Sequence, residues 1–155
     1  MMRGMDGGNM FKTNPKIYNT VEYSFYRHFI MMFSILLIIL TLIYASLLTM
    51  SYSVILFIIA LVNCLAFLFL DLYYIVKMII LLTCYNNFIY MEIDTTDMVI
   101  THPNSTYTAI WVFVGDDRYT SDKVIKLHKF ARLVKNDMIR VGLNDKNQKC
   151  IIFID

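Results

Sequence analysis

The residues from 123 to 132, KVIKLHKFAR, gather side chains that could bind an anion. Five of the ten positions are basic or titratable, namely Lys123, Lys126, His128, Lys129 and Arg132. Lysine and arginine at this density can make charge-assisted hydrogen bonds with phosphate oxygens. The whole chain is 58% hydrophobic, so this stretch stands out. Three kinds of partner fit such a segment: lipid headgroups, a nucleic acid or a small polyanion.

A helix from about Asp122 to Lys135, capped by Ser121, would position these basic side chains. At spacings of three and four, apolar residues fall on one side of this helix. Lys126, Lys129 and Arg132 line the other side. That side has no acidic residue at four-residue spacing to balance it. Two interpretations stay open, the solvated face of an ordinary amphipathic helix and a binding surface.

The predicted helix belongs to a small cytosolic α+β domain over residues 85–155. Three strands are expected before it, FIYMEI and MVITH joined at residues 94–97, then TYTAIWVFVG. A closing hairpin, DMIRVGL with KCIIFI, follows the helix. The order is therefore βββαββ. The third strand is apolar on both faces, and one helix covers only one of them. A domain of this size rarely builds enough core alone, so we expect a homo-oligomer, such as a tetramer.

The charge of this domain favours a small polyanion. Residues 118–149 contain nine Lys or Arg against three Asp, a net charge of +6. Headgroup binding is disfavoured because Asp116 and Asp117 flank the basic segment. Duplex nucleic acid would need a larger basic surface with a recognisable reading module. A compact phosphate-bearing ligand, surrounded by Lys126, His128, Lys129 and Arg132 of several subunits, fits better. Tyr119 could stack on its bases; Trp111 could too, but fits the core better.

An uncharged run of 43 residues, from His28 to Leu70, predicts the membrane part. One bilayer crossing needs about 20 apolar residues, so the run is long enough for two. The polar cluster TMSYS near its middle predicts a turn at the far membrane surface. We expect helices over about 29–48 and 52–72, in a transmembrane hairpin spanning 27–84. Asp71 and Lys77 mark the exit of the second helix, and Asp71 is expected near the membrane interface.

The basic residues also predict the orientation of the hairpin. Residues 1–26 form an arm, helical from about residue 15, and carry Arg3, Lys12 and Lys16. Lys77 follows the second helix, whereas the TMSYS turn carries no basic residue. Positive charge stays on the cytosolic side. We therefore expect the protein in the inner (plasma) membrane, with both termini in the cytosol.

Asn63 is a polar residue near the middle of the second membrane helix. A buried amide in a bilayer normally finds a hydrogen-bond partner on another helix. That partner lies either on the first helix, where Ser34 and Thr41 are the main polar residues, or on a second subunit. Because the first helix offers few partners, we favour a contact between subunits.

A two-span hairpin followed by a basic cytosolic α+β domain of about 70 residues, together with expected oligomerisation, resembles the small membrane effectors of type III CRISPR systems. The resemblance covers the whole chain and is architectural, since it rests on no signature motif. It implies a protein that binds cyclic oligoadenylate in a homo-oligomer and then perturbs the membrane in antiviral defence.

Enzymatic and metal sites have little support in this sequence. The three histidines and three cysteines are widely spread, without metal-binding spacing or a nucleophile–base pair. We expect no enzyme, no cofactor and no metal, although His102 or His128 could act as the base of a ribonuclease. The main alternative to an effector is a structural or accessory subunit of a large membrane complex, such as a respiratory assembly.

The hairpin makes a topological prediction. A cysteine introduced by Thr49→Cys should react with an impermeant thiol reagent only from the side opposite both termini, because basic residues avoid this turn. Labelling from the cytosolic side would contradict the hairpin.

Overall fold

The computed structural model describes residues 16–50, 53–101, 105–126, 130, 132–134 and 136–154. The chain divides into two compact units. One unit, the sheet unit, combines the residues up to Ser24 with those from Thr83 onward. The other, the helical unit, contains residues 25–82. The arm that precedes the apolar run therefore shares a unit with the domain that follows it.

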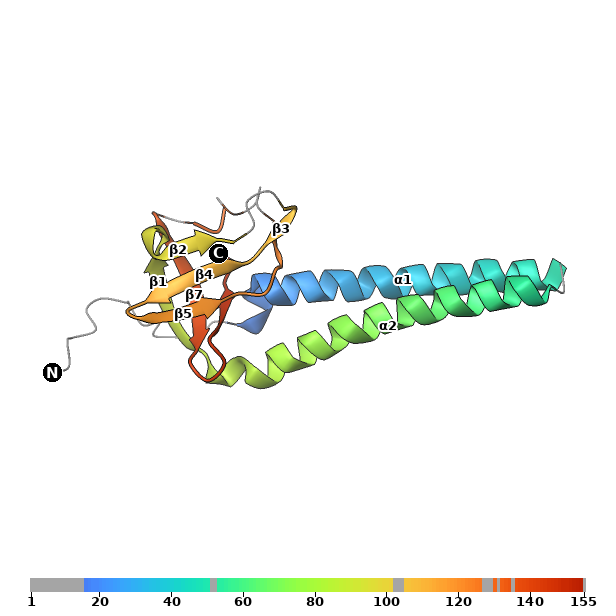
Figure 1. Ribbon diagram of the computed structural model, residues 1–155, viewed down its shortest axis with the longest axis horizontal. Helices are drawn as coiled ribbons and strands as arrows, with labels where there is room; N and C mark the ends of the chain where they lie inside the picture. The colour runs from blue at the N-terminus through green and yellow to red at the C-terminus, as the bar shows by residue number, and fades with distance from the viewer. Residues whose placement is uncertain are drawn as a thin grey trace. The chain divides into compact units, whose positions relative to one another are not determined.

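Two long helices, α1 (Val21–Met50) and α2 (Val54–Cys84), contain the apolar run (Figure 1). Both are long and apolar enough to cross a membrane, as the sequence predicts. Arg27 lies 23 residues before Met50, where α1 ends, and Lys77 lies 23 residues after Val54, where α2 begins. At 1.5 Å per residue this is about 35 Å, which is close to the thickness of the hydrocarbon core of a bilayer.

The sheet unit contains eight strands among its described residues (Figure 1). These are β1 (Ile89–Asp94), β2 (Met98–Ile100), β3 (Tyr107–Thr108), β4 (Ile110–Val114), β5 (Asp117–Thr120), β6 (Ile125–Lys126), β7 (Met138–Asn144) and β8 (Lys149–Ile152). Three short 3₁₀ turns accompany them, at Ile17–Asn19, Tyr85–Asn87 and Thr95–Asp97. Gly115, with a φ of 61°, makes the turn between β4 and β5, a conformation that suits glycine.

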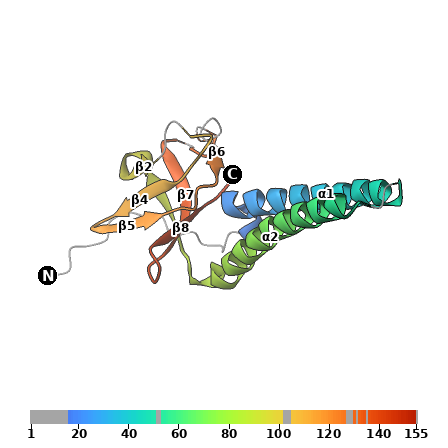
Figure 2. The ribbon, with the colours of Figure 1, turned by 45° about the vertical axis from the view of Figure 1, so that its right-hand side comes forward.

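Six strands form one mixed sheet in the order β1-β7-β8-β5-β4-β2, and β3 pairs with β6 in a separate ribbon (Figure 2). All pairs are antiparallel except β5 with β8, which are parallel and meet only at Thr120 and Lys149. The sequence predicts β1 and β2 and their short connection correctly. β1 and β2 do not pair with each other as the two strands of a hairpin would, because they lie at opposite ends of the strand order.

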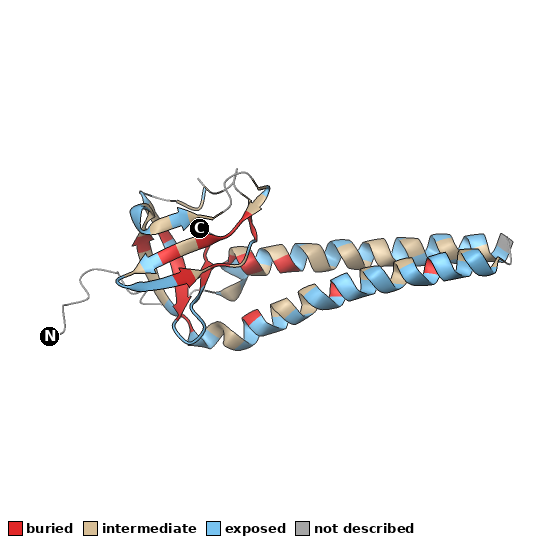
Figure 3. Cartoon of the chain, in the orientation of Figure 1, coloured by how far each residue is buried: buried red, intermediate tan, exposed pale blue. Residues whose placement is uncertain are grey.

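The core of the sheet unit comes from alternate residues of the central strands. On β7, Ile139, Val141 and Leu143 are buried, and Val141 lies opposite Ile152 of β8. Ile110, Val112 and Ile125 are also fully buried. Figure 3 shows this buried band on the strands and a mostly exposed surface on the two helices. The β-branched content of these strands fits a pleated, packed surface.

The first part of the helix predicted from Asp122 to Lys135 is wrong, whereas Phe130 is helical and residues 127–129, 131 and 135 lie outside the described residues. Ile125 and Lys126 form β6, and Val124 and Ile125 are both buried although they are neighbours in the chain. Ser121 does not cap a helix, because its Oγ accepts a hydrogen bond from the Ile110 N–H at 2.8 Å. The β5 strand, with sequence DRYT, was also missed. The structure therefore shows an apolar helical pair followed by a mixed sheet, and the part of βββαββ between Lys126 and Met138 is described only at residues 130, 132–134 and 136–137.

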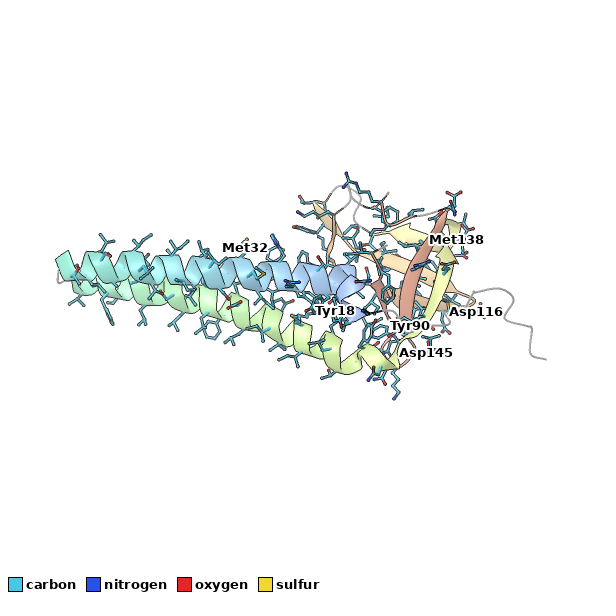
Figure 4. The ribbon with its side chains drawn as sticks, turned by 180° about the vertical axis from the view of Figure 1, so that it is seen from behind. Tyr18, Met32, Tyr90, Asp116, Met138 and Asp145 are labelled. Carbon is cyan, nitrogen blue, oxygen red and sulfur yellow. The ribbon has the colours of Figure 1, made fainter. Side chains whose placement is uncertain are left out.

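A second, aromatic layer covers the other face of β1, β7 and β8. The Tyr90 ring, labelled in Figure 4, lies over Gly142, and its hydroxyl donates to the Tyr85 carbonyl at 2.9 Å. Phe153 meets Tyr90 edge-on, with ring centroids 5.6 Å apart. A Cβ atom at Gly142 would lie 2.9 Å from Ile151 Cγ1 and 3.1 Å from the Tyr90 ring. This position therefore has no room for a side chain.

Gly142→Ala should lower the free energy of unfolding by about 1–3 kcal/mol, since an added methyl group forces a packed ring and a packed isoleucine apart. The fluorescence of Trp111, the single tryptophan, can follow urea unfolding of the full chain in micelles. Tyr90→Leu in the same background should recover part of the loss by removing the ring. Equal midpoints for Gly142→Ala and the wild type would contradict this packing.

Candidate functional site

The basic side chains that the structure describes in residues 123–132 do not share one helix face, because Lys126 lies on a strand. Lys126 lies on β6, with its ammonium group 5.5 Å from the centroid of the Tyr107 ring on β3. Arg132 is exposed in a turn and Lys123 is exposed before β6. His128 and Lys129 lie outside the described residues. Of the four predicted basic ligands, the structure therefore places only Lys126 in a defined contact.

A second cation–aromatic pair lies on the neighbouring strands β4 and β5. The guanidinium carbon of Arg118 is 4.8 Å from the Trp111 ring centroid. Arg118 is opposite Phe113 in the register, so it reaches Trp111 diagonally. Trp111 is half-buried, whereas the next residue on the strand, Val112, is fully buried. Trp111 therefore lies on the outward side of β4, where Arg118 is a partner that the sequence pattern does not predict.

The outward side of β2, β4 and β5 is partly apolar and open. We call this surface, made of Val99, Trp111, Phe113 and Arg118, the aromatic face. Val99 is 45% exposed and Phe113 is 39% exposed. The sequence predicts that the third strand is apolar on both sides, and the structure shows that one side is core while the other has no full cover among the described residues.

Tyr119, predicted to stack on a base, has another role in the structure. Its side chain is on the inward side of β5, and the residue is 6% exposed. The hydroxyl donates a hydrogen bond to Asp145 Oδ1 at 2.6 Å, and this bond to a carboxylate raises the pKa of Tyr119 to about 12. A buried ring offers no face to a base, so the structure does not support this residue as a stacking platform.

Two ion pairs account for other basic residues of the sheet unit. Arg140 contacts Glu92 at 3.0 Å and Lys149 contacts Asp122 at 2.8 Å. Within the described part of the chain, no carboxylate is paired with Lys126 or with Arg118. Each of these two cations lies instead on an aromatic ring, an arrangement that leaves hydrogen-bond donors for an anionic ligand.

Among the described cysteines, the one buried thiol is a poor candidate for a nucleophile. Cys150 is buried, and burial raises the pKa of its thiol well above the ordinary value. A thiol that stays protonated is a poor nucleophile. Across the described residues, no three His, Cys, Asp or Glu side chains lie close enough to hold a metal ion. His102 and His128, the candidate ribonuclease bases, lie outside the described residues.

Asn63 makes its hydrogen bond within the chain. Its Nδ2 donates to the hydroxyl of Tyr44 on α1 at 2.9 Å. The Nδ2 group thus has its partner on the first helix, one of the two alternatives, and a contact between subunits stays a prediction. Tyr44 offers a further hydroxyl group beside those of Ser34 and Thr41, the polar partners expected on α1.

Asp71 is a second polar residue inside the helical unit. Its place near the membrane interface stays a prediction; in the structure the residue is only 8% exposed and its carboxyl group bonds to α1. Its Oδ2 accepts a hydrogen bond from Ser34 Oγ at 2.9 Å. Its Oδ1 has no hydrogen-bond partner in the described residues. Three residues further along α2, the Tyr74 ring stacks with Phe29 and with Phe33, at centroid distances of 5.1 and 5.8 Å.

Comparisons with protein-family models, with curated proteins and with solved structures found no match for this chain. The site must therefore be judged on its own contacts.

The Asn63–Tyr44 bond should stabilise the helical pair by about 0.6–2 kcal/mol. Asn63→Leu and Tyr44→Phe should lower stability by similar amounts, and the double variant should add little, because either change removes the same bond. Unfolding in mixed SDS micelles, followed by circular dichroism, measures these effects.

Thr41→Val is the matched control for this pair, since Thr41 bonds only to the Leu37 carbonyl of its own helix. A loss of oligomer mass with Asn63→Leu, without any effect of Tyr44→Phe, would instead support a contact between subunits.

Proposed function

We propose that this protein is a membrane-anchored binding protein whose sheet unit takes a small phosphate-bearing nucleotide. The observation that carries the proposal is the pair of cation–aromatic contacts, Lys126 on Tyr107 and Arg118 on Trp111. A nucleotide needs both chemistries, because its phosphates pair with cations and its bases stack on rings.

Lys126 is the stronger candidate for the phosphate. Arg118 follows directly after Asp116 and Asp117 in the chain, and two carboxylates near it would repel an anion. Lys126 lies in the segment of highest positive charge and has Tyr107 rather than a carboxylate beside it. Arg118 and Trp111 are better suited to a planar base, which the guanidinium and the indole can both stack against.

The helical unit anchors this binding module in a bilayer. Apolar side chains project outward along both helices, as Met32 does in Figure 4, and Val54 is 74% exposed. An apolar surface of this extent requires lipid or partner helices around it. The basic residues at the ends of the apolar run support the proposal that both termini lie in the cytosol of a cell with this protein in its plasma membrane.

A homo-oligomer completes the proposed effector. The aromatic face is partly apolar and open, so a second copy or the ligand itself can cover it. The resemblance to type III CRISPR effectors makes cyclic oligoadenylate the first ligand to test and membrane perturbation the expected output. A ligand acts on the membrane part only through a difference in its affinity for two arrangements of the protein.

Binding of cyclic oligonucleotides to the full chain in nanodiscs tests this function. We expect Lys126→Ala to weaken binding about ten- to a hundredfold, because a hydrogen bond to a charged group contributes about 1.5–3 kcal/mol. Arg118→Ala should weaken it less. Lys146→Ala, which removes an exposed lysine in the turn between β7 and β8, is the matched control and should bind like the wild type.

Wild-type affinity in folded Lys126→Ala and Arg118→Ala variants would contradict the proposed surface. If cyclic oligonucleotides of every ring size fail to bind, native mass spectrometry separates the alternatives. A protein that needs other chains to stay dispersed would support the structural-subunit hypothesis, since its aromatic face would then be a subunit interface.

A further inference from the structure

Glu22 lies in the first turn of α1 and belongs to the sheet unit. It precedes the uncharged run that is long enough to cross a membrane. The residue is 2% exposed. Its Oε2 accepts a hydrogen bond from the Ile152 N–H of β8 at 3.1 Å, a contact that bridges 130 residues of sequence. Its Oε1 has no hydrogen-bond partner among the described residues.

This contact fills a gap in the sheet. β8 pairs with β7 along one edge, whereas β5 reaches its other edge only at Lys149. The Phe153 N–H points to β7, where it bonds to the Arg140 carbonyl at 3.0 Å. Because N–H directions alternate along a strand, the amides of Ile152 and Ile154 point to the edge that β5 has left.

Residues 19–22 take the place of the missing strand along that edge. Thr20 forms a bridge with Phe153, and the Asn19 carbonyl accepts from the Ile154 N–H at 2.6 Å. Glu22 is already in α1, so its side-chain carboxyl group, and not its backbone carbonyl, accepts the hydrogen bond from the Ile152 N–H. The start of α1 is therefore fastened to β8 through a side chain.

The charges that surround Glu22 do not provide a counter-ion. Lys149, on β8, is already paired with Asp122 at 2.8 Å, and Asp122 itself adds a negative charge near Glu22. Cys150, also on β8, is neutral because its thiol is buried. Burial therefore raises the pKa of Glu22 from 4.5 to about 8. A neutral carboxyl group is much cheaper to bury than an unpaired carboxylate.

We propose that Glu22 is a protonation-controlled latch, which holds the first turn of α1 on the free edge of β8 while it is neutral and releases it when it ionises. This inference goes beyond the proposed nucleotide binding and does not depend on it. The latched state binds the proton more tightly than the open state. The stability that this proton gives is fully present below pH 4.5 and is lost as the pH rises toward about 8.

The consequence for the protein follows from the continuity of α1. Val21–Met50 is one helix, and its first turn lies in the sheet unit while the rest belongs to the helical unit. Release of the latch frees the Ile152 amide and removes the fastening at the beginning of this helix. Protonation of one side chain can thus change how the apolar helix is held.

The chain contains only two glutamates, Glu22 and Glu92, which makes a direct test possible. The full chain, labelled with carboxyl-¹³C glutamate in micelles, should show two carboxyl signals, and Glu92→Gln identifies that of Glu22. We expect the Glu22 signal to titrate between about pH 7 and about pH 9. Over the same interval, hydrogen exchange of the Ile152 amide, corrected for its intrinsic rate, should lose about tenfold in protection.

Glu92→Gln is the matched control, because it removes a half-buried carboxylate that contacts Arg140 and should leave both results unchanged. Glu22→Gln should make the Ile152 protection independent of pH. The latch would be overturned by a Glu22 signal that titrates near pH 4.5, or by an Ile152 amide whose protection stays constant between about pH 7 and about pH 9. Since the titration uses the native residue, it decides the question even if Glu22→Gln does not fold.

Discussion

The backbone of a buried strand must have hydrogen-bond partners on both edges, and this requirement governs the architecture of the sheet unit. β8 lies in the middle of the sheet, but β5 accompanies it for a single residue pair. The segment just before the apolar helix supplies the remaining partners through Asn19, Thr20 and Glu22. A buried N–H without a partner costs about 1–3 kcal/mol. The arm is therefore part of the sheet unit, and a fragment that begins at residue 85 would lack these contacts.

The same requirement explains the interior of the helical unit. Two pairs of polar side chains meet between the helices, Asn63 with Tyr44 and Asp71 with Ser34, whereas the exposed Thr41 and Ser46 hydroxyls donate to carbonyls of their own helix. This leaves the outer surface of both helices almost wholly apolar. The two units find hydrogen-bond partners for different groups, because a sheet exposes backbone N–H and C=O groups at its edges whereas a helix pairs them internally. In the helices only side chains need partners.

The sequence predicts those elements whose signal lies within one segment. The uncharged run gives both helices, and alternating apolar residues give β1, β2, β4, β7 and β8. The start of the segment 122–135 forms β6 and not the predicted helix, because its apolar residues fit a helical period whereas pairing with the distant β3 decides their conformation. Lys126 was found as a candidate but its ring partner was not, and Tyr119 was misjudged because burial depends on the neighbouring strands. Glu22 gave no signal, since an acidic residue in a first helical turn is ordinary.

The long reach of the Glu22 contact also sets an order of events during synthesis. β8 is made after both apolar helices, because it follows Glu22 by 130 residues. The helices contain mainly local contacts and can form, and enter a membrane, while β8 is still within the ribosome. Until then residues 19–22 have no strand to join, and their own polar groups must rely on water. Closure of the sheet is thus a late step that joins an early segment of the chain to a late one.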